Sequence, residues 1–173
     1  MRARKAFMSN KITVSFQTKV KKSLSLDISD GMIVVVCGSI GYGGLPKIRR
    51  VQSLLREKGF QLLDHISEEY MDYSGTKNFK DKRELAERIV KHDLEYIKKG
   101  DVIVAVSNGP SYGTAIEMFV AKQLGKHVIL YSEEEVPTPW PIAFSDITAS
   151  DLDGLVLSLK EFEKRTQNRE RLH

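Results

Sequence analysis

The chain has 173 residues, which suits a single domain with one core, and 41% hydrophobic and 29% charged residues are usual for a globular protein. No apolar run approaches the roughly 20 residues that span a bilayer, which excludes a membrane protein. The net charge of +4 arises in residues 1–26, which hold seven basic residues and no acidic one. The rest of the chain has 20 basic and 23 acidic residues and is therefore slightly acidic, which excludes a nucleic-acid partner for the folded part on charge grounds.

Residues 1–31 are predicted to be a basic extension that precedes the domain. The segment is rich in Arg and Lys, as mitochondrial transit peptides are, but residues 11–16 alternate like a strand and no secretory hydrophobic region is present. Two interpretations stay open, a disordered leader without a function and an added strand. In both, Met32 resembles the natural start of the domain.

Cysteine usage indicates the cellular compartment. Cys37 is the only cysteine, and it lies in the apolar run 33–37. It has no partner for an intrachain disulfide, and a zinc site built on cysteines is not expected. We therefore expect a cytoplasmic protein, because thiols stay reduced there.

From Met32 onward, short β-branched runs alternate with longer amphipathic segments, a pattern typical of βαβ units around a parallel sheet. The predicted strands are residues 32–37, 60–63, 101–106 and 127–131. The predicted helices are residues 46–58, 82–99, 114–124 and 152–165, the second capped by Asp81. Between them lie a polar segment 66–81, long enough for a lid, and a proline-rich stretch 136–141, and the chain ends in a charged tail, 166–173. The pattern predicts one doubly wound α/β domain over residues 32–165.

The first candidate site is the loop after the first strand, because ligands of such sheets bind at the carboxyl ends of the strands. The loop has four glycines in seven residues and reads Gly38, Ser39, Ile40, Gly41, Tyr42, Gly43, Gly44. Its backbone N–H groups can approach a phosphate, although it lacks both the dinucleotide-binding spacing and the Walker lysine. The alternative is a tight turn from strand to helix without a ligand.

Asp93 is the second candidate. It stands four residues from both Ile89 and Ile97, on the apolar stripe of its helix. A carboxylate in such a position must be hydrogen-bonded or face a cleft in which its pKa is raised. The alternative is a structural role as a cap or as an ion-pair partner of Arg88 or Lys91.

The third candidate is the segment from Pro110 to Glu117, which passes from a polar loop into a helix. Ser111 and the free N–H groups of the helix start can bind a phosphate. Glu117 lies about one turn into the helix and can point back toward the strand ends, because helical side chains lean toward the N-terminus. Glu is also common in first turns for its interaction with the helix dipole, so this position alone leaves its role open.

Taken together, these residues resemble one family. Cys37–Ile40, Asp64-His65, Asp93–Ile97, Gly100–Ala105, Pro110–Gly113 and Glu117 follow the order of the motifs of nucleoside 2-deoxyribosyltransferases. The resemblance covers about residues 32–132 and is greatest to the Rcl-type 2'-deoxynucleoside 5'-phosphate N-hydrolases.

The resemblance implies a flavodoxin-like fold, a homodimer and a small-molecule nucleotide substrate, with no cofactor. It implies Glu117 as the nucleophile at C1', Asp93 near the base and ribose, and Ser39 and Ser111 at the 5'-phosphate. The other candidate binding residues are the glycine-rich loop, His65 and Gly113.

Departures from the hydrolases concern the phosphate and the sugar. Val35 stands where they have a tyrosine, Gly41-Tyr42 where they have an arginine, and Ala115-Ile116 where the family has Gly-Tyr. The two carboxylates are kept.

The two carboxylates suit cleavage of an N-glycosidic bond, in which one attacks the anomeric carbon and an acid assists the leaving base. We therefore predict a hydrolase that forms a covalent glycosyl-Glu117 intermediate. No metal is expected, because His65 and His92 have no ligand partner at a useful spacing. Alternatives are a transferase that exchanges bases, a phosphoribohydrolase of the Lonely-guy type, which Gly113-Thr114 and Glu117 partly resemble, and a nucleotide sensor without catalysis.

Overall fold

A computed structural model describes residues 31–41, 43–68 and 71–171. The predicted extension therefore lies outside the described residues, except for Gly31, and so does Tyr42 of the glycine-rich loop. Gly31–His173 is one compact unit. Among the helices of the described ranges, none is long and apolar enough to cross a membrane.

Strands and helices alternate along the described chain. The strands are β1 (Ile33–Gly38), β2 (Gln61–Leu62), β3 (Val102–Val106), β4 (His127–Tyr131) and β5 (Ile147–Ala149). The helices are α1 (Leu45–Glu57), α2 (Arg83–Lys99), α3 (Tyr112–Gln123), α4 (Pro139–Ala143) and α5 (Leu152–Glu170). All strand pairs are parallel, in the order β2-β1-β3-β4-β5, which is the flavodoxin order. The predicted flavodoxin-like, Rossmann-type α/β fold is confirmed.

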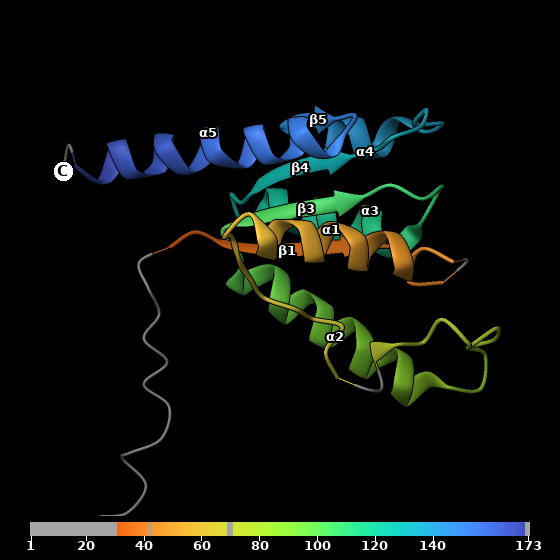
Figure 1. Cartoon of the computed structure of the whole chain (residues 1–173). Coiled ribbons are helices and arrows are strands. Elements are labelled where there is room, and N and C mark those ends of the chain that lie inside the picture. Colours follow the sequence, from red (N-terminus) through yellow and green to blue (C-terminus); the bar gives the residue numbers. More distant parts are fainter. Residues whose placement is uncertain (1–30, 42, 69–70, 172–173) are drawn as a thin grey trace, which may run out of the picture. The chain divides into compact units, whose positions relative to one another are not determined.

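Helices cover both faces of the sheet, so the central strands are apolar on both sides (Figure 1). Successive residues of a strand point to opposite faces. Val34 and Val36 belong to the core cluster that includes residues of α1 and α5. Val35 and Cys37 belong to the second cluster, which includes residues of α2 and α3. This alternation decides which side chains of β1 lie under α2 and α3.

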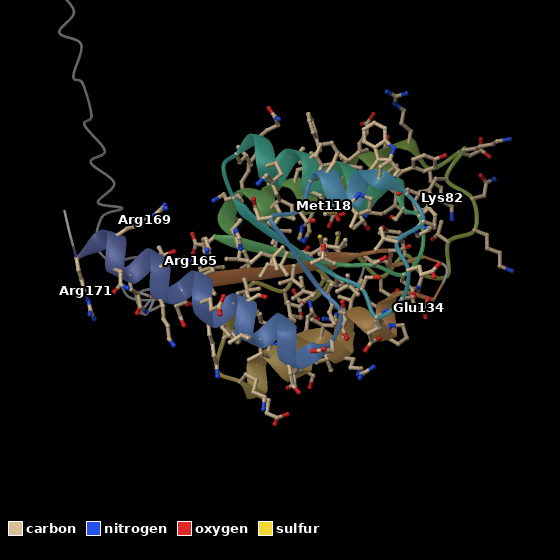
Figure 2. The ribbon with its side chains drawn as sticks, turned by 90° about the horizontal axis from the view of Figure 1, so that it is seen from above. Lys82, Met118, Glu134, Arg165, Arg169 and Arg171 are labelled. Atoms are coloured by element: carbon tan, nitrogen blue, oxygen red, sulfur yellow. The ribbon has the colours of Figure 1, made fainter. Side chains whose placement is uncertain are left out.

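Two helix boundaries differ from the prediction. Helix α2 begins at Arg83 after Lys82, which makes no side-chain capping bond, so the predicted Asp81 cap is wrong. Helix α5 continues to Glu170, so the predicted end of the last helix at residue 165 is wrong as well. Neither Gly nor Pro interrupts the sequence after Gly154, and Thr166 Oγ1 donates to the Phe162 carbonyl at 3.1 Å. Figure 2 shows Arg165 and Arg169 along this last part of α5 and Arg171 directly after it.

Two short elements were not predicted. Helix α4 has five residues and begins with Pro139 after Thr138, because proline is tolerated in a first turn. Strand β5 has only three residues, and Ile147 pairs with Ile129 of β4. Such short segments carry too few residues for a periodic signal.

We propose that residues 32–165 hold the functional domain and that the basic extension is not needed for its folding. A variant that starts at Gly31 is expected to unfold in one cooperative transition within about 3 °C of the full chain, because Gly31–His173 is a compact unit. Thermal unfolding followed by circular dichroism measures this. Aggregation of the shortened chain would contradict the proposal and favour an added strand at residues 11–16.

Candidate active site

The candidate site lies at the carboxyl ends of β1 and β3. Gly38 at the end of β1 pairs with Val106 at the end of β3, so the loops that follow the two strands begin side by side. The chain leaves β1 toward the β2 edge and leaves β3 toward the β4 edge. Such a switch point opens the crevice in which α/β sheets bind ligands.

Three ionisable side chains meet near this switch point. Glu117 of α3, Asp93 of α2 and His65, which follows β2, each place one polar atom within 4.8 Å of the others. All three are nearly buried, with exposed fractions of 7% for Glu117 and 2% for His65 and 12% for the Asp93 side chain. Asp93 Oδ1, Glu117 Oε2 and His65 Nδ1 have no hydrogen-bond partner among the described residues. Buried polar atoms without partners are costly, so these three atoms lack a stabilising contact of the kind that a ligand can supply.

The two carboxyl groups have raised pKa values. Burial raises the pKa of Asp93. Burial and the charge of Asp93 both raise the pKa of Glu117. Two carboxylates this close do not ionise independently, so the pair keeps a proton at a pH where exposed carboxyl groups are charged. Burial lowers the pKa of His65 to about 4, so its imidazole is neutral near pH 7.

Helix packing places both carboxylates. Asp93 stands between Ile89 and Ile97, which are buried as predicted, and this turns Asp93 toward the sheet. Helix α3 begins at Tyr112, two residues before the predicted start, because the Ser111 hydroxyl caps it by accepting from the Thr114 N–H at 3.3 Å. Glu117 is consequently in the second turn of α3.

An ion-pair network fixes His65. Its neighbour Asp64 accepts from Arg49 at 2.6 Å, from Arg56 at 2.8 Å and from the Ile66 N–H at 3.1 Å. Burial alone would raise the pKa of Asp64, but these donors outweigh it and lower the pKa. The network ties the end of β2 to α1, and the His65 ring then lies with Nε2 at 3.7 Å from Asp93 Oδ1.

The fold also corrects the expectation that His65 has no metal-ligand partner. His65, Asp93 and Glu117 form a group that could hold a metal ion. They lie on three separate elements, so no local spacing in the sequence reveals them.

Two positions of the glycine-rich loop leave no space for a side chain. A Cβ on Gly44 would collide with the Ser39 carbonyl oxygen, and one on Gly38 would lie 2.9 Å from the Val106 carbonyl oxygen. The Ser39 hydroxyl donates to the Gly41 carbonyl at 3.1 Å and so closes the loop. The loop is a tight turn, whether or not it binds a phosphate.

The remaining predicted binding residues are placed differently. Gly43 has a φ of 80°, which favours glycine, and Ile40 is buried in the core, so only the Ile40 backbone can face a ligand. Tyr42 lies outside the described residues. Ser111 and Gly113 stand at the start of α3, near the end of β3.

Two further residues of the site were not predicted. Cys37 lies in the same core cluster as Met118, the residue after Glu117, and its thiol pKa is raised by burial and by the charge of Glu117. Tyr73 of the predicted lid packs its ring against Phe79 at 5.7 Å between ring centres and is close enough to Asp93 and Glu117 for their charges to raise its pKa. Alternation in β1 places Cys37 on the same face as Val35, but nothing in the sequence indicates that Glu117 covers that face.

Several solved structures resemble this one. A 2-deoxyribosyltransferase from the psychrotolerant bacterium Bacillus psychrosaccharolyticus has a TM-score of 0.55 at 20% identity, over 71% of this chain and 89% of its own. A conserved protein from Enterococcus faecalis V583 has a TM-score of 0.56 at 15% identity, over 76% and 98%. A CMP N-glycosidase from Clostridium botulinum has a TM-score of 0.44 at 20% identity, over 74% and 98%. The first two share the fold of this chain.

Sequence comparisons give the family. A search of curated proteins found no match. The family profile described as nucleoside 2-deoxyribosyltransferase matches residues 45–165, which is more than two thirds of the chain and includes His65, Asp93 and Glu117. The chain therefore belongs to the nucleoside 2-deoxyribosyltransferase family.

Proposed function

We propose that this protein hydrolyses the N-glycosidic bond of nucleoside or 2'-deoxynucleoside 5'-monophosphates, giving a free base and the sugar 5-phosphate. The observation that carries the proposal is the buried pair of Asp93 and Glu117, with polar atoms that lie within 4.8 Å of each other and have no partner among the described residues. The family membership supports chemistry at the glycosidic bond.

Glu117 acts as the nucleophile in this mechanism. One of its carboxylate oxygens forms a bond to C1' while the bond from C1' to the base nitrogen breaks, which gives a glycosyl-Glu117 ester. Asp93, whose pKa is raised by burial, donates its proton or a hydrogen bond to the departing base. Water then attacks C1' of the ester, and the sugar 5-phosphate leaves with the original configuration at C1'.

The spacing of the carboxylates supports this two-step route. Retaining glycosidases hold their carboxyl groups about 5 to 5.5 Å apart, whereas inverting enzymes leave about 6.5 to 9.5 Å for a water molecule. Asp93 and Glu117 have oxygens within 4.8 Å of each other, which is closer to the spacing of the retaining enzymes than to that of the inverting ones. A metal ion held by the same oxygens would occupy the lone pair that attacks C1', so we propose that a proton, not a cation, is shared here.

We propose that the start of α3 holds the 5'-phosphate. The Ser111 oxygen accepts from the Thr114 N–H and from Thr114 Oγ1 at 3.1 Å, which uses both of its lone pairs. The Ser111 proton therefore stays available to donate, beside the N–H groups of the first turn of α3. Helix N-termini of this kind favour anions.

Ser111→Ala is expected to lower kcat/KM for monophosphates by about 10- to 150-fold, because a hydrogen bond to a charged group contributes about 1.5 to 3 kcal/mol. Free nucleosides should be affected far less. The change also removes the α3 cap, so Ser111→Asp is the matched variant: Asp caps as well as Ser does but repels a phosphate. Steady-state kinetics on both substrate types, with thermal unfolding of each variant, measures this. An equal loss on both substrate types would rule out the phosphate role.

The function itself is tested by incubating the protein with a panel of ribo- and deoxyribonucleoside monophosphates and following free base by chromatography. We expect release of base, unchanged by EDTA. A second free base in the mixture tests the alternative of a base-exchanging transferase, which the family description favours. Exchange without hydrolysis, and equal use of unphosphorylated nucleosides, would establish the transferase. Binding without release of base would point to a nucleotide sensor.

We also propose that the protein is a homodimer. Large apolar side chains are exposed on α3 and on α4, namely Tyr112, Ile116, Phe119, Trp140 and Ile142. Apolar side chains that gather in this way are typical of an interface between proteins. A partner that covers α3 would approach the helix carrying Glu117.

A further inference from the structure

A second cluster of charged side chains lies at the other end of the sheet from the candidate active site. His127 is the first residue of β4 and pairs with Val102, the first residue of β3, so it marks the amino ends of these strands. Helix α5 runs back toward the same ends, away from the arrowheads of the strands (Figure 1). The cluster is therefore separate from the site at the carboxyl ends of β1 and β3.

The cluster surrounds a cavity of about 250 Å³, which is lined by His127, Phe162, Arg165, Thr166 and Arg169. The last four residues recur every three or four positions of α5, so they share one face of that helix. None of the lining residues is acidic. The cavity is smaller than the roughly 300 to 1,000 Å³ of typical small-molecule sites, so it suits a small ionic group better than a whole nucleotide.

Stacked rings form one wall of the cavity. His127 lies parallel to Phe162, with 4.2 Å between the ring centres and 3° between the ring planes. Asp146 also holds His127, because Asp146 Oδ2 lies 3.3 Å from His127 Nδ1 and accepts from the Val128 N–H at 2.9 Å. His127 Nε2 is enclosed and has no hydrogen-bond partner within the described ranges. The wall is thus fixed in place and has one polar atom that no neighbour satisfies.

Two arginines of the cavity, Arg165 and Arg169, have no acidic partner in the part of the chain that the structure describes. Their one side-chain hydrogen bond there runs from Arg165 Nε to the Glu161 carbonyl at 3.3 Å, so the forked ends of both guanidinium groups can bind a ligand. Asp146, the acidic group beside His127, pairs with Lys122 of α3 instead. Figure 2 shows both arginines on the last part of α5. Like charges four residues apart on a helix repel each other, and an anion between them would remove that cost.

We propose that this cavity is an anion-binding site, separate from the start of α3, that holds a phosphate group between Arg165 and Arg169. Guanidinium groups bind phosphate oxygens through paired, charge-assisted hydrogen bonds. Burial lowers the pKa of His127, so its imidazole is neutral near pH 7 and the positive charge of the site comes from the two arginines. The site shares no residue with the candidate active site, and it does not depend on the proposed function.

The test is a titration of the full chain, labelled with ¹⁵N, with inorganic phosphate, in which amide shifts are followed by NMR. Amides of residues 127 and 162–169 report on this cavity, whereas amides of residues 112–114 report on the start of α3, so one experiment separates the two proposed phosphate sites. We expect saturable shifts at the cavity. A charge-assisted hydrogen bond at an open cavity is partly screened by water, so Arg165→Gln and Arg169→Gln should each weaken the affinity by about 5- to 10-fold.

Lys164→Gln is the matched control. It removes the same charge from an exposed position of the same helix, but Lys164 does not line the cavity, so the affinity should stay close to that of the wild type. Both arginines are exposed, and their variants should therefore keep the Tm of the wild type. Thermal unfolding followed by circular dichroism measures this.

Shifts that do not saturate at millimolar phosphate would overturn the proposal. An equal loss of affinity in Lys164→Gln would do so as well, because it would indicate attraction to the charge of α5 as a whole. Ribose 5-phosphate in a parallel titration distinguishes the two sources of the phosphate group. Tighter binding than inorganic phosphate supports a site for phosphate esters, and weaker binding supports a site for the free ion. The titration needs no turnover, so it decides this proposal even if no base is released and the proposed function fails.

Discussion

Glu117→Gln is expected to abolish turnover, lowering kcat by about 10³-fold or more, because an amide oxygen cannot form the glycosyl ester. Gln keeps the size of the side chain, so α3 and the core around Met118 should be undisturbed. Glu95→Gln is a matched control, since Glu95 is an exposed glutamate on α2. Base release from the best substrate of the panel measures the loss. Residual activity above roughly 10% of wild type would mean that Glu117 is not the nucleophile.

The same variant should be more stable than the wild type at neutral pH. Burial is the main cause of the raised pKa of Glu117 in the folded state. The folded protein therefore binds the Glu117 proton more tightly than the unfolded chain does. The stability contributed by that proton is complete below the usual pKa of Glu and is lost as the pH rises through the folded value. The amide of Glu117→Gln cannot ionise, so the Tm of the variant should exceed that of the wild type increasingly from pH 5 to 8. Equal Tm values across this range would contradict the prediction that ionisation of buried Glu117 lowers the stability of the wild type.

The sheet and the two carboxylates could be predicted because their signals are local. The run Ile33–Cys37 is apolar without alternation, as a strand covered on both faces is, and Asp93 interrupts an otherwise regular apolar stripe. The rule that ligands bind at the carboxyl ends of parallel strands then placed Glu117 near Asp93.

The rest of the site depends on contacts between distant segments. His65 reaches Asp93 because Asp64 is held by Arg49 and Arg56 of α1, and that network joins residues that share no pattern. Tyr73 comes from a polar segment without periodicity, yet it lies close to both carboxylates. The position of Cys37 beneath α3 could not be predicted either, because strand alternation gives its face but not the helix above that face.

Asp93→Asn is expected to lower kcat/KM by about 10²-fold for substrates whose base is a poor leaving group. This loss corresponds to about 2.7 kcal/mol of transition-state stabilisation. Asn cannot supply a proton, although its amide can still donate a weaker hydrogen bond. The pKa of Asp93 is raised by burial, so wild-type activity should also decline at alkaline pH as this proton is lost, and the variant should lack that decline. The pH profile and the substrate dependence are measured together.

The decisive comparison for Asp93 uses the leaving group. A 7-methylated purine already carries a positive charge and leaves without protonation, so acid assistance contributes little to its release. Asp93→Asn should therefore reduce cleavage of 7-methylguanosine monophosphate by only a few-fold, against about 10²-fold for guanosine monophosphate. A structural role would act on both alike, since a misplaced Glu117 attacks every substrate less well. Equal losses on the two substrates would thus assign Asp93 to holding the site together, and the proton for the base would have to come from another group.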